Sequence, residues 1–352
     1  MADIAQPSLR PSGDGPAVGL PADGLVIAVL TYRRPEDIAL TLPRLAGQAD
    51  MRHAGPGQTG TGPAPEDAPA DLTADLQATV LVIDNDPQAS ARRIVEELAG
   101  TLAPGLVRYV HEPKPGIAAA RNRALSEAAS SALLVFIDDD EVPSERWLAQ
   151  LVGLQRSTGA AAVVGPVISE YEHEPEPWIE AGMFFHRRRL ATGTRLDVAA
   201  TNNLLLDLQQ VRARRLWFDE RFGLSGGSDT LFTRRLVQRG GSMLWCDEAA
   251  VVDRVPSSRL TRSWVLRRAL RSGNSATRVS LELATGTGAR LAARVASLGS
   301  GSVRLLGGSA RLAAGLVSGS AGHQAKGMRT AARGLGMAAG AFGYVYSEYR
   351  RK

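Results

Sequence analysis

An apolar stretch at residues 133–137 is followed directly by four acidic side chains, Asp138, Asp139, Asp140 and Glu141. Carboxylates this close repel one another unless a positive charge balances them, and carboxylate oxygens are ligands that Mg²⁺ and Mn²⁺ prefer. The cluster therefore predicts a divalent cation that also contacts substrate phosphates. The alternative is a polar turn or helix start, where acidic residues are also common.

A second polar turn, residues 84–86, follows another apolar stretch at 78–83. The Asp84 carboxylate could accept a hydrogen bond from the N–H of a pyrimidine ring, with the peptide groups of Thr31 and Tyr32 lining the same crevice. Asp, Asn and Pro are also the residues of ordinary turns. Both interpretations stay open for this segment taken alone.

Two glycine-containing helix starts carry further candidates. Gly116 precedes a helical stretch whose free N–H groups could meet an anion, and Arg121 in that stretch could pair with anionic or base oxygens. A solvated surface arginine is the alternative. Farther along, a glycine pair precedes Ser228 and Asp229. Asp229 could act as a general base at the start of a helix, or either residue could simply cap that helix.

These candidates are positioned by alternating strands and helices. Strands are predicted at 25–30, 78–83, 106–110, 133–137 and 161–168, with a strand pair at 242–252. Helices are predicted from residue 36 and at 88–99, 117–129, 145–156 and 229–239. This alternation is typical of a mainly parallel sheet covered on both faces, and such sheets bind ligands at the carboxyl ends of their strands.

The chain of 352 residues is long enough for a large main domain and an appendage. A Pro/Gly-rich disordered leader is expected at 1–24 and a flexible insertion at about 49–76. The leader lacks the pattern of a signal peptide, and no apolar run is long enough for a conventional spanning helix. The single cysteine, Cys246, favours a reducing compartment, so a cytoplasmic location is expected.

The net charge of +5 hides a marked asymmetry. Residues 256–352 carry 16 basic and 2 acidic side chains, whereas residues 1–255 carry 25 basic and 34 acidic ones. Basic, moderately apolar helices at the C-terminus are typical of segments that lie on an anionic membrane surface. The alternatives are helices that pack on the main domain, and a tail that binds nucleic acid.

Six segments, read together and in order, resemble family 2 inverting glycosyltransferases over residues 25–275. They are VIAVLTYRRP, VLVIDND, KPGIAAARNRAL, LVFIDDDEVPSERWL, TNNLLL and a long stretch that begins FGLSGGSDTLFTRRL. The last is similar to bacterial polysaccharide and exopolysaccharide transferases in particular. The resemblance implies the GT-A (nucleotide-diphospho-sugar transferase) fold, an α/β architecture with a mainly parallel sheet and helices on both faces. A basic helical appendage at 276–352 would follow it.

The resemblance also implies roles for single residues. Asp229 matches the catalytic base, and Asp140 matches the acid that binds Mg²⁺ or Mn²⁺. The positions that match the donor-nucleotide site are Thr31, Tyr32, Arg34, Asp84, Arg121, Asp138 and Asp139. The region of the sugar and the acceptor corresponds to Asn202, Asn203, Gly227 and Ser228.

Two positions depart from the family pattern. Many members have Glu-Asp where this chain has Ser228 and Asp229, which leaves Asp229 as the one acid for the role of base. A histidine that often serves as a further metal ligand is replaced by Asp253. Its oxygens are compatible with Mg²⁺ or Mn²⁺, and a salt bridge with Arg254 is the alternative.

The implied reaction is the transfer of a sugar, with inversion, from a nucleotide-diphosphate sugar to an acceptor hydroxyl. The resemblance implies a metal-dependent glycosyltransferase of cell-surface polysaccharide synthesis that acts on a glycan or lipid-linked saccharide. It would be peripheral on the cytoplasmic face of the inner membrane. A sugar nucleotidyltransferase needs the same paired acids, metal and nucleotide and is the alternative enzyme. A non-enzymatic nucleic-acid-binding protein is disfavoured by the few aromatic residues of the tail, so no nucleic acid is expected.

Overall fold

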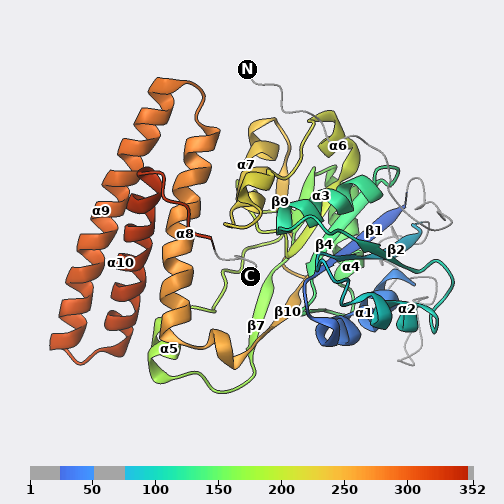
Figure 1. The fold of residues 1–352 in the computed structure, drawn as a ribbon, viewed down its shortest axis with the longest axis horizontal. Helices are drawn as coiled ribbons and strands as arrows, with labels where there is room; N and C mark the ends of the chain where they lie inside the picture. Colours follow the sequence, from blue (N-terminus) through green and yellow to red (C-terminus); the bar gives the residue numbers. More distant parts are fainter. Residues whose placement is uncertain (1–23, 51–75, 348–352) are drawn as a thin grey trace.

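The computed structural model of the chain describes residues 24–50 and 76–347. The predicted leader at 1–24 and the predicted insertion at 49–76 lie outside the described residues except at their edges. Within the described ranges, the elements form two sheets, the helices that cover the larger one, and a C-terminal group of three long helices (Figure 1).

A seven-stranded sheet lies at the centre of the fold. In spatial order its strands are β3 (Val107–His111), β2 (Ala78–Asp84), β1 (Leu25–Thr31), β4 (Leu133–Asp138), β8 (Asn203–Asp207), β6 (Ala162–Val164) and β9 (Met243–Trp245). The first four run parallel to one another, β8 runs antiparallel to β4 and β6, and β9 is parallel to β6. The prediction of a mainly parallel sheet is confirmed, with β8 as the reversed strand.

Helices cover both faces of this sheet. One face packs against α1 (Pro35–Ala49), α2 (Arg92–Ala99) and α4 (Trp147–Thr158), and the other against α3 (Ile117–Glu127), α6 (Leu208–Ala213) and α7 (Ser228–Gln238). Within β1, Ile27 and Val29 enter the first core, whereas Val26 and Ala28 enter the second. Because successive side chains point to opposite faces and both faces are covered, the strands are continuously apolar in sequence.

A smaller sheet of three strands, β5 (Glu141–Pro143), β10 (Val251–Val255) and β7 (Val167–Tyr171), lies beside the large one. It corrects two predictions. The single strand expected at 161–168 is divided between the two sheets as β6 and β7, because Gly165 and Pro166 interrupt it. A Cβ atom on Gly165 would lie 2.0 Å from the carbonyl oxygen of Ala249, and proline has no N–H to donate. The strand pair expected at 242–252 is likewise divided, since β9 and β10 belong to different sheets.

The C-terminal region folds as α8 (Arg262–Leu283), α9 (Thr287–Val317) and α10 (Ala321–Ala341), which lie side by side (Figure 1). The predicted helical appendage is confirmed, although the predicted boundary at residue 275 falls within α8. Helix α10 also contacts the short helix α5 (Pro177–Gly182), and α8 contacts α7. The alternative that the tail packs on the main domain is thus realised by these contacts.

Glycine lets the helices of the appendage approach closely. A Cβ atom on Gly336 of α10 would lie 1.9 Å from the carbonyl oxygen of Leu270 in α8. One on Gly308 of α9 would lie 2.5 Å from the backbone nitrogen of Ala331 in α10. Backbones therefore meet directly at these interfaces, and larger side chains of α9 are left on its outer side.

Candidate active site

The carboxyl ends of three neighbouring strands bring the polar turns together. Thr31 at the end of β1 lies beside Asp84 at the end of β2, and Leu30 of β1 lies beside Asp138 at the end of β4. In open α/β sheets the ligand crevice lies outside this edge. The structure therefore places the two predicted polar turns and the end of β1 side by side at one edge of the sheet.

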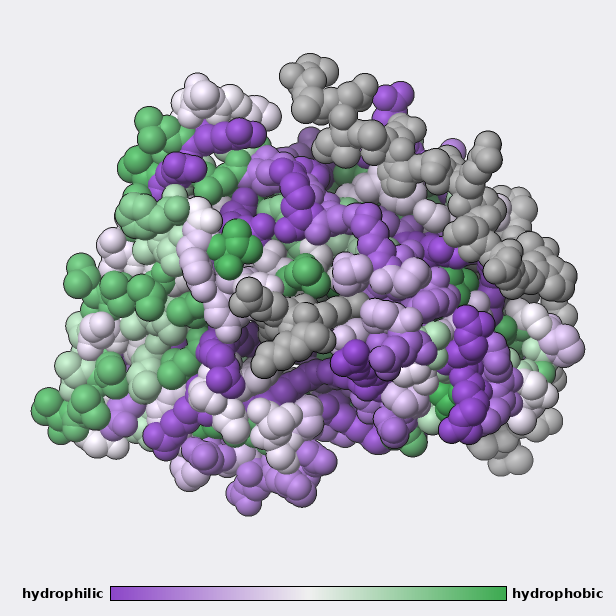
Figure 2. Space-filling view, viewed as in Figure 1, coloured by the Kyte–Doolittle hydropathy of each residue, from purple (hydrophilic) through white to green (hydrophobic). Residues whose placement is uncertain are grey.

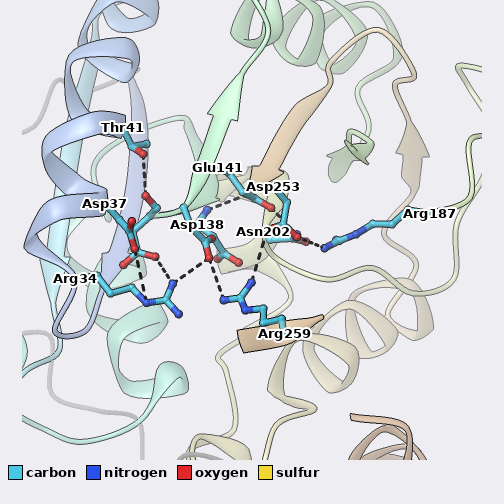
Figure 3. A network of polar contacts seen from close by, with 11 residues as sticks. Arg34, Asp37, Thr41, Asp138, Glu141, Arg187, Asn202, Asp253 and Arg259 are labelled. Carbon is cyan, nitrogen blue, oxygen red and sulfur yellow. Dashed lines mark hydrogen bonds and ion pairs between the residues drawn. The ribbon is translucent and has the colours of Figure 1, made fainter. Parts of the chain in front are cut away.

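A tight turn between β4 and β5 concentrates the acids (Figure 3). Asp139 and Glu141 are buried, whereas Asp138 and Asp140 are half-buried. The antiparallel register of β5 and β10 places Asp253 opposite Glu141, so an acid remote in sequence joins the cluster. Five carboxyl groups thus share a small, partly dehydrated volume.

Arginines from distant segments balance part of this charge. The Oδ2 atom of Asp140 accepts hydrogen bonds from Nη1 of Arg34 and from Nη2 of Arg259, each at 3.0 Å. Arg34 also donates to Oδ1 of Asp139 at 3.1 Å. Arg34 comes from the loop after β1, and Arg259 ends the 3₁₀ helix η3 (Ser257–Arg259) between β10 and α8. Asp140 is consequently clamped between two cations.

Asp253 is only partly compensated. Its Oδ2 atom accepts a hydrogen bond of 2.7 Å from Nη2 of Arg187, as Figure 3 shows. Its buried Oδ1 atom accepts no hydrogen bond from any described residue, and Nη1 of Arg259 lies 3.7 Å away. The predicted alternative partner, Arg254, is exposed. A buried carboxylate oxygen without a donor is costly, so this atom is suited to a further cation.

Burial and mutual repulsion weaken the acidity of the cluster. Burial, reinforced by the charge of Asp140, raises the pKa of Asp138 to about 6. Burial raises the pKa of Asp139 to about 7 even though Arg34 attracts the charged form. The pKa of Glu141 is also raised, by burial and by the charge of Asp138. The cluster therefore lacks positive charge, because a fully balanced site would hold its acids ionised.

The donor set fits a hard divalent cation. Residues 24–50 and 76–347 contain no group of three or more His, Cys, Asp or Glu side chains arranged to hold a metal ion by themselves. Mg²⁺ in nucleotide sites is held by one or two carboxylates together with substrate phosphates and water, so a three-residue cage is not required. Asp140, which is half-buried, and Asp253, whose Oδ1 atom accepts no hydrogen bond from a described residue, are the residues that match this requirement.

Asp84 is fully buried, and both of its carboxylate oxygens are used within the protein. Oδ1 accepts from the backbone N–H of Asp86 at 2.9 Å, and Oδ2 accepts from the N–H of Ala91 at 2.8 Å and the hydroxyl of Tyr109 at 3.0 Å. These bonds shape the turn between β2 and α2. Contact between Asp84 and a nucleotide base stays a prediction, and a base would share an oxygen that is already hydrogen-bonded.

The loop after β1 is tied to the loop after β2 by Arg33. Its Nε atom donates to Oδ1 of buried Asp86 at 3.3 Å, and its guanidinium lies 5.2 Å from the ring centre of Tyr32. Arg33 adopts a positive φ of 55°, which is uncommon for a residue other than glycine. After this strained turn, Arg34 reaches Asp139 and Asp140.

The predicted base, Asp229, lies in the first turn of α7. Gly226 and Gly227 both have positive φ angles, 78° and 97°, which glycine adopts without strain. Gly227 is the N-cap of α7 and offers no side chain, so neither Ser228 nor Asp229 serves as the cap. Among the described residues, the side-chain hydrogen bonds of Asp229 go to Thr230 alone, at 2.7 Å and 3.4 Å.

Arg121 links the start of α7 to the acid cluster. Its Nη1 atom donates to the hydroxyl of Ser228 at 2.9 Å, and its charge also acts on Asp138. Its guanidinium lies over the ring of Phe218, 5.4 Å from the ring centre, which holds it in place. The loop that carries Asp229 is therefore one side chain away from the acid cluster.

The two neighbouring asparagines have different positions. Asn202 donates to Oε1 of Glu141 at 2.7 Å and belongs to the cluster. Asn203 is buried, accepts from Nε1 of Trp147 at 2.8 Å and donates to the carbonyls of Pro166 and Ala249. The prediction that Asn203 contacts the sugar or acceptor is not supported, because protein groups already use its side chain in the core.

Sequence reasoning missed Arg187 and Arg259 as members of the site. Arg187 belongs to a segment without a recognisable motif, and Arg259, although it follows Asp253 by six residues in the long matched stretch, was assigned no role. The excess of acidic residues in the main domain was the available signal, because buried carboxylates require nearby cations.

Comparison with known proteins identifies the family to which the chain is similar. Residues 70–209 match the model of the family described as Glycosyl transferase family 2. The succinoglycan biosynthesis protein ExoM of Rhizobium meliloti (strain 1021) is 36% identical over 262 residues, which cover 74% of this chain and 76% of the relative. The glycosyltransferase AglE of Haloferax volcanii is 27% identical over 169 residues, 48% of this chain and 54% of the relative.

Among solved structures, residues 1–349 of TarS from S. aureus align with a TM-score of 0.47 at 16% identity, covering 78% of this chain and 72% of that one. The fold described above is that of an α/β protein with a cluster of acids at the carboxyl edge of its mainly parallel sheet. Because the chain matches the family model and is similar to ExoM over most of both lengths, it belongs to glycosyl transferase family 2.

Replacing Arg187 by methionine should lower stability. The change leaves Asp253, whose side chain is 8% exposed, without its closest cation, while Arg187 itself is 33% exposed. We expect a loss of about 1–2 kcal/mol in the free energy of unfolding, measured by urea denaturation, because the pair is only partly buried. The neighbouring Arg188→Met, at an exposed position, is the matched control. Equal stability of the two variants would contradict the importance of this ion pair.

Proposed function

We propose that this protein is an inverting glycosyltransferase that moves a sugar from a nucleotide-diphosphate sugar to a hydroxyl group of a saccharide acceptor. The observation that carries the proposal is that Arg121 links the acid cluster to the start of α7, because its Nη1 atom donates to Ser228, the residue before Asp229, and its charge acts on Asp138. Family membership and the name of the relative ExoM support a role in the synthesis of an exopolysaccharide.

The donor would lie at the carboxyl ends of β1, β2 and β4. Thr31, Tyr32 and the turn that contains Asp84 line the side proposed for the nucleoside. Asp140 and Asp253 would hold Mg²⁺ or Mn²⁺, which when bound would neutralise charge on the leaving diphosphate. Arg34 and Arg259, which now balance Asp140, are placed to meet the same negative charge. Asp138 and Asp139 complete the acidic wall of this part of the crevice.

Asp229 would accept the proton of the acceptor hydroxyl as its oxygen attacks the anomeric carbon. In that step a new C–O bond forms on the face opposite the departing nucleoside diphosphate, so the configuration at the carbon inverts. The glycine pair at residues 226–227 supplies the positive φ angles of the turn that precedes Asp229. Release of nucleoside diphosphate, not pyrophosphate, would distinguish this reaction from nucleotidyl transfer.

Asp229→Asn should abolish transfer while leaving donor binding nearly unchanged. The amide preserves the shape of the side chain but cannot accept the proton, so we expect the transfer rate to fall by about 10²–10⁴-fold. The donor is first selected by screening a panel of nucleotide sugars for binding to the native chain. The affinity of the variant for that donor, measured by titration, should stay within about twofold of the native value, since no charge is removed from the diphosphate site. Asp197→Asn, on an exposed acid, is the control. Normal turnover by the Asp229 variant would refute its role as base.

We also propose that the enzyme is peripheral on the cytoplasmic face of the membrane, where α9 meets the lipid surface. None of the described helices combines the length and apolar content needed to cross a membrane. Six large apolar residues of α9 are more than 60% exposed, namely Leu291, Val295, Val303, Leu306, Leu316 and Val317. Figure 2 shows hydrophobic side chains gathered over the helical region, at the left of the view.

These side chains share one side of α9. Its buried residues, Ser297, Gly301, Gly308 and Gly315, face the other helices, and the helical repeat places the apolar set on the opposite side. Arg304 and Arg311 lie nearer the buried glycines than the apolar side, since a Cβ atom on Gly334 of α10 would lie 3.1 Å from the Cβ atom of Arg304. An apolar face on a basic helix matches the interface of an anionic bilayer, to which each nearby Arg contributes roughly 1 kcal/mol.

The double variant Val303→Asp/Leu306→Asp should lose vesicle binding. Two charges in the apolar face remove side-chain burial and add repulsion from anionic lipid, so we expect partitioning to fall at least about tenfold. Flotation with vesicles of phosphatidylcholine and phosphatidylglycerol measures it. The matched control is Leu40→Asp/Val198→Asp, at exposed apolar positions of the main domain. Equal flotation of both double variants would contradict docking through α9.

A further inference from the structure

A cleft of about 510 Å³ lies outside the acid crevice, where α8, the start of α9, the end of α10 and the 3₁₀ helix η2 (Glu220–Phe222) meet. Four arginines line it, Arg221, Arg278, Arg290 and Arg294, together with a single acid, Glu282. The role proposed above for the donor site uses none of these residues. The cleft therefore has a strong positive charge that needs a separate explanation.

Carboxylates neutralise only one side of this cleft. Arg221 donates to Asp219 at 2.6 Å and to Glu282 at 2.5 Å. Arg278, Arg290 and Arg294 form no ion pair with any described carboxylate. Arg278 contacts the hydroxyl of Ser225, and Arg290 lies 3.4 Å from the carbonyl oxygen of Ala284. Three guanidinium groups therefore face the cleft with capacity for an anion of more than one negative charge.

The start of α9 adds to this positive character. Its N-cap is Gly286, which has no side chain to cap the first turn, and Thr287, the first helical residue, lines the cleft. The positive end of the helix dipole and the adjacent N–H groups therefore favour an anion beside the arginines. Arg290 and Arg294 follow one and two turns later.

The remainder of the cleft is apolar. Phe222, Leu281 and Leu291 line it, and Leu291 is also the first of the exposed apolar side chains that continue along α9. An anion in the cleft would consequently lie at one end of the apolar face proposed to meet the bilayer. A ligand with a charged head and an aliphatic chain would match both parts.

The cleft adjoins the loop that carries the proposed base. Arg278 contacts Ser225 through its guanidinium, which lies 4.4 Å from the ring centre of Phe222. Phe222 in turn approaches Gly227, since a Cβ atom at that glycine would lie 3.4 Å from its ring. Ser225 and Gly227 precede Asp229 by four and two residues. A molecule held by the cleft would therefore lie next to the loop of the base.

We propose that this cleft binds the diphosphate or phosphate head of a lipid-linked saccharide acceptor. The arginines bind the charged head of this ligand. The apolar residues of the cleft and the outer face of α9 contact its aliphatic chain, and its sugar extends toward Asp229. This inference rests on the proposed function, because it names the class of acceptor for that reaction. The shared chemistry of the head is a phosphate ester or diphosphate, and the experiment separates a lipid from a free anion.

The test is direct binding of geranylgeranyl diphosphate to the full chain, with inorganic pyrophosphate as the free anion. We expect the lipid diphosphate to bind more tightly than pyrophosphate. Arg290→Glu/Arg294→Glu should weaken its binding at least about tenfold, since two charged contacts become repulsive. Arg304→Glu/Arg311→Glu makes the same charge change farther along α9 and should stay within about twofold. Because all four positions are exposed, both variants should keep the far-ultraviolet circular dichroism of the native chain.

Three outcomes would overturn the inference: no binding of the lipid diphosphate by the native chain, equal affinity for pyrophosphate, or equal loss in both double variants. Hydrolysis of the nucleotide-sugar donor without acceptor, measured on the same samples, tests the proposed function separately. Arg290→Glu/Arg294→Glu should keep that hydrolysis while losing transfer to a lipid-linked acceptor. Donor hydrolysis absent from every sample would count against the proposed function, whereas the binding result would still decide the cleft.

Discussion

Asp140 accepts hydrogen bonds from two arginines that lie more than two hundred residues apart in the sequence, and this shared contact holds the crevice together. Arg34 belongs to the first loop of the main sheet, whereas Arg259 belongs to the segment that leads into the helical region. The need to balance carboxylates in a partly dehydrated space thus joins three parts of the chain. Without such cations the turn after β4 would be strongly unfavourable.

The negative charge of the acid cluster that the arginines leave unbalanced also bears on the proposed reaction. The raised pKa values of Asp138 and Asp139 and the donorless oxygen of Asp253 indicate a crevice that still lacks positive charge. A divalent cation with a diphosphate would supply the charge and introduce the substrate together. Asp229 lies in the first turn of α7 but does not cap that helix, which is consistent with the role proposed for its carboxylate.

The sequence was sufficient to predict the features that depend on residues close together in the chain. Buried strands are read from continuous apolar stretches, and polar turns after them converge because parallel strands end at one edge, as Thr31, Asp84 and Asp138 do. Pairing between distant segments was not predictable in this way. The separation of β9 from β10, the burial of Asn203 between Trp147 and two carbonyls, and the approach of Arg187 to Asp253 all depend on tertiary contacts. A side chain type alone could not distinguish an asparagine in the core from one in the crevice.

The claim that the acid cluster binds the donor through a cation is tested most directly by donor titration with and without Mn²⁺. The native chain should bind its nucleotide sugar at least about tenfold more tightly with Mn²⁺, because the cation joins the diphosphate to the acids. Asp140→Ala should remove that difference, while Asp197→Ala, at an exposed acid, should keep it. Donor affinity that is indifferent to Mn²⁺ in the native chain, or a full Mn²⁺ effect in Asp140→Ala, would contradict the account.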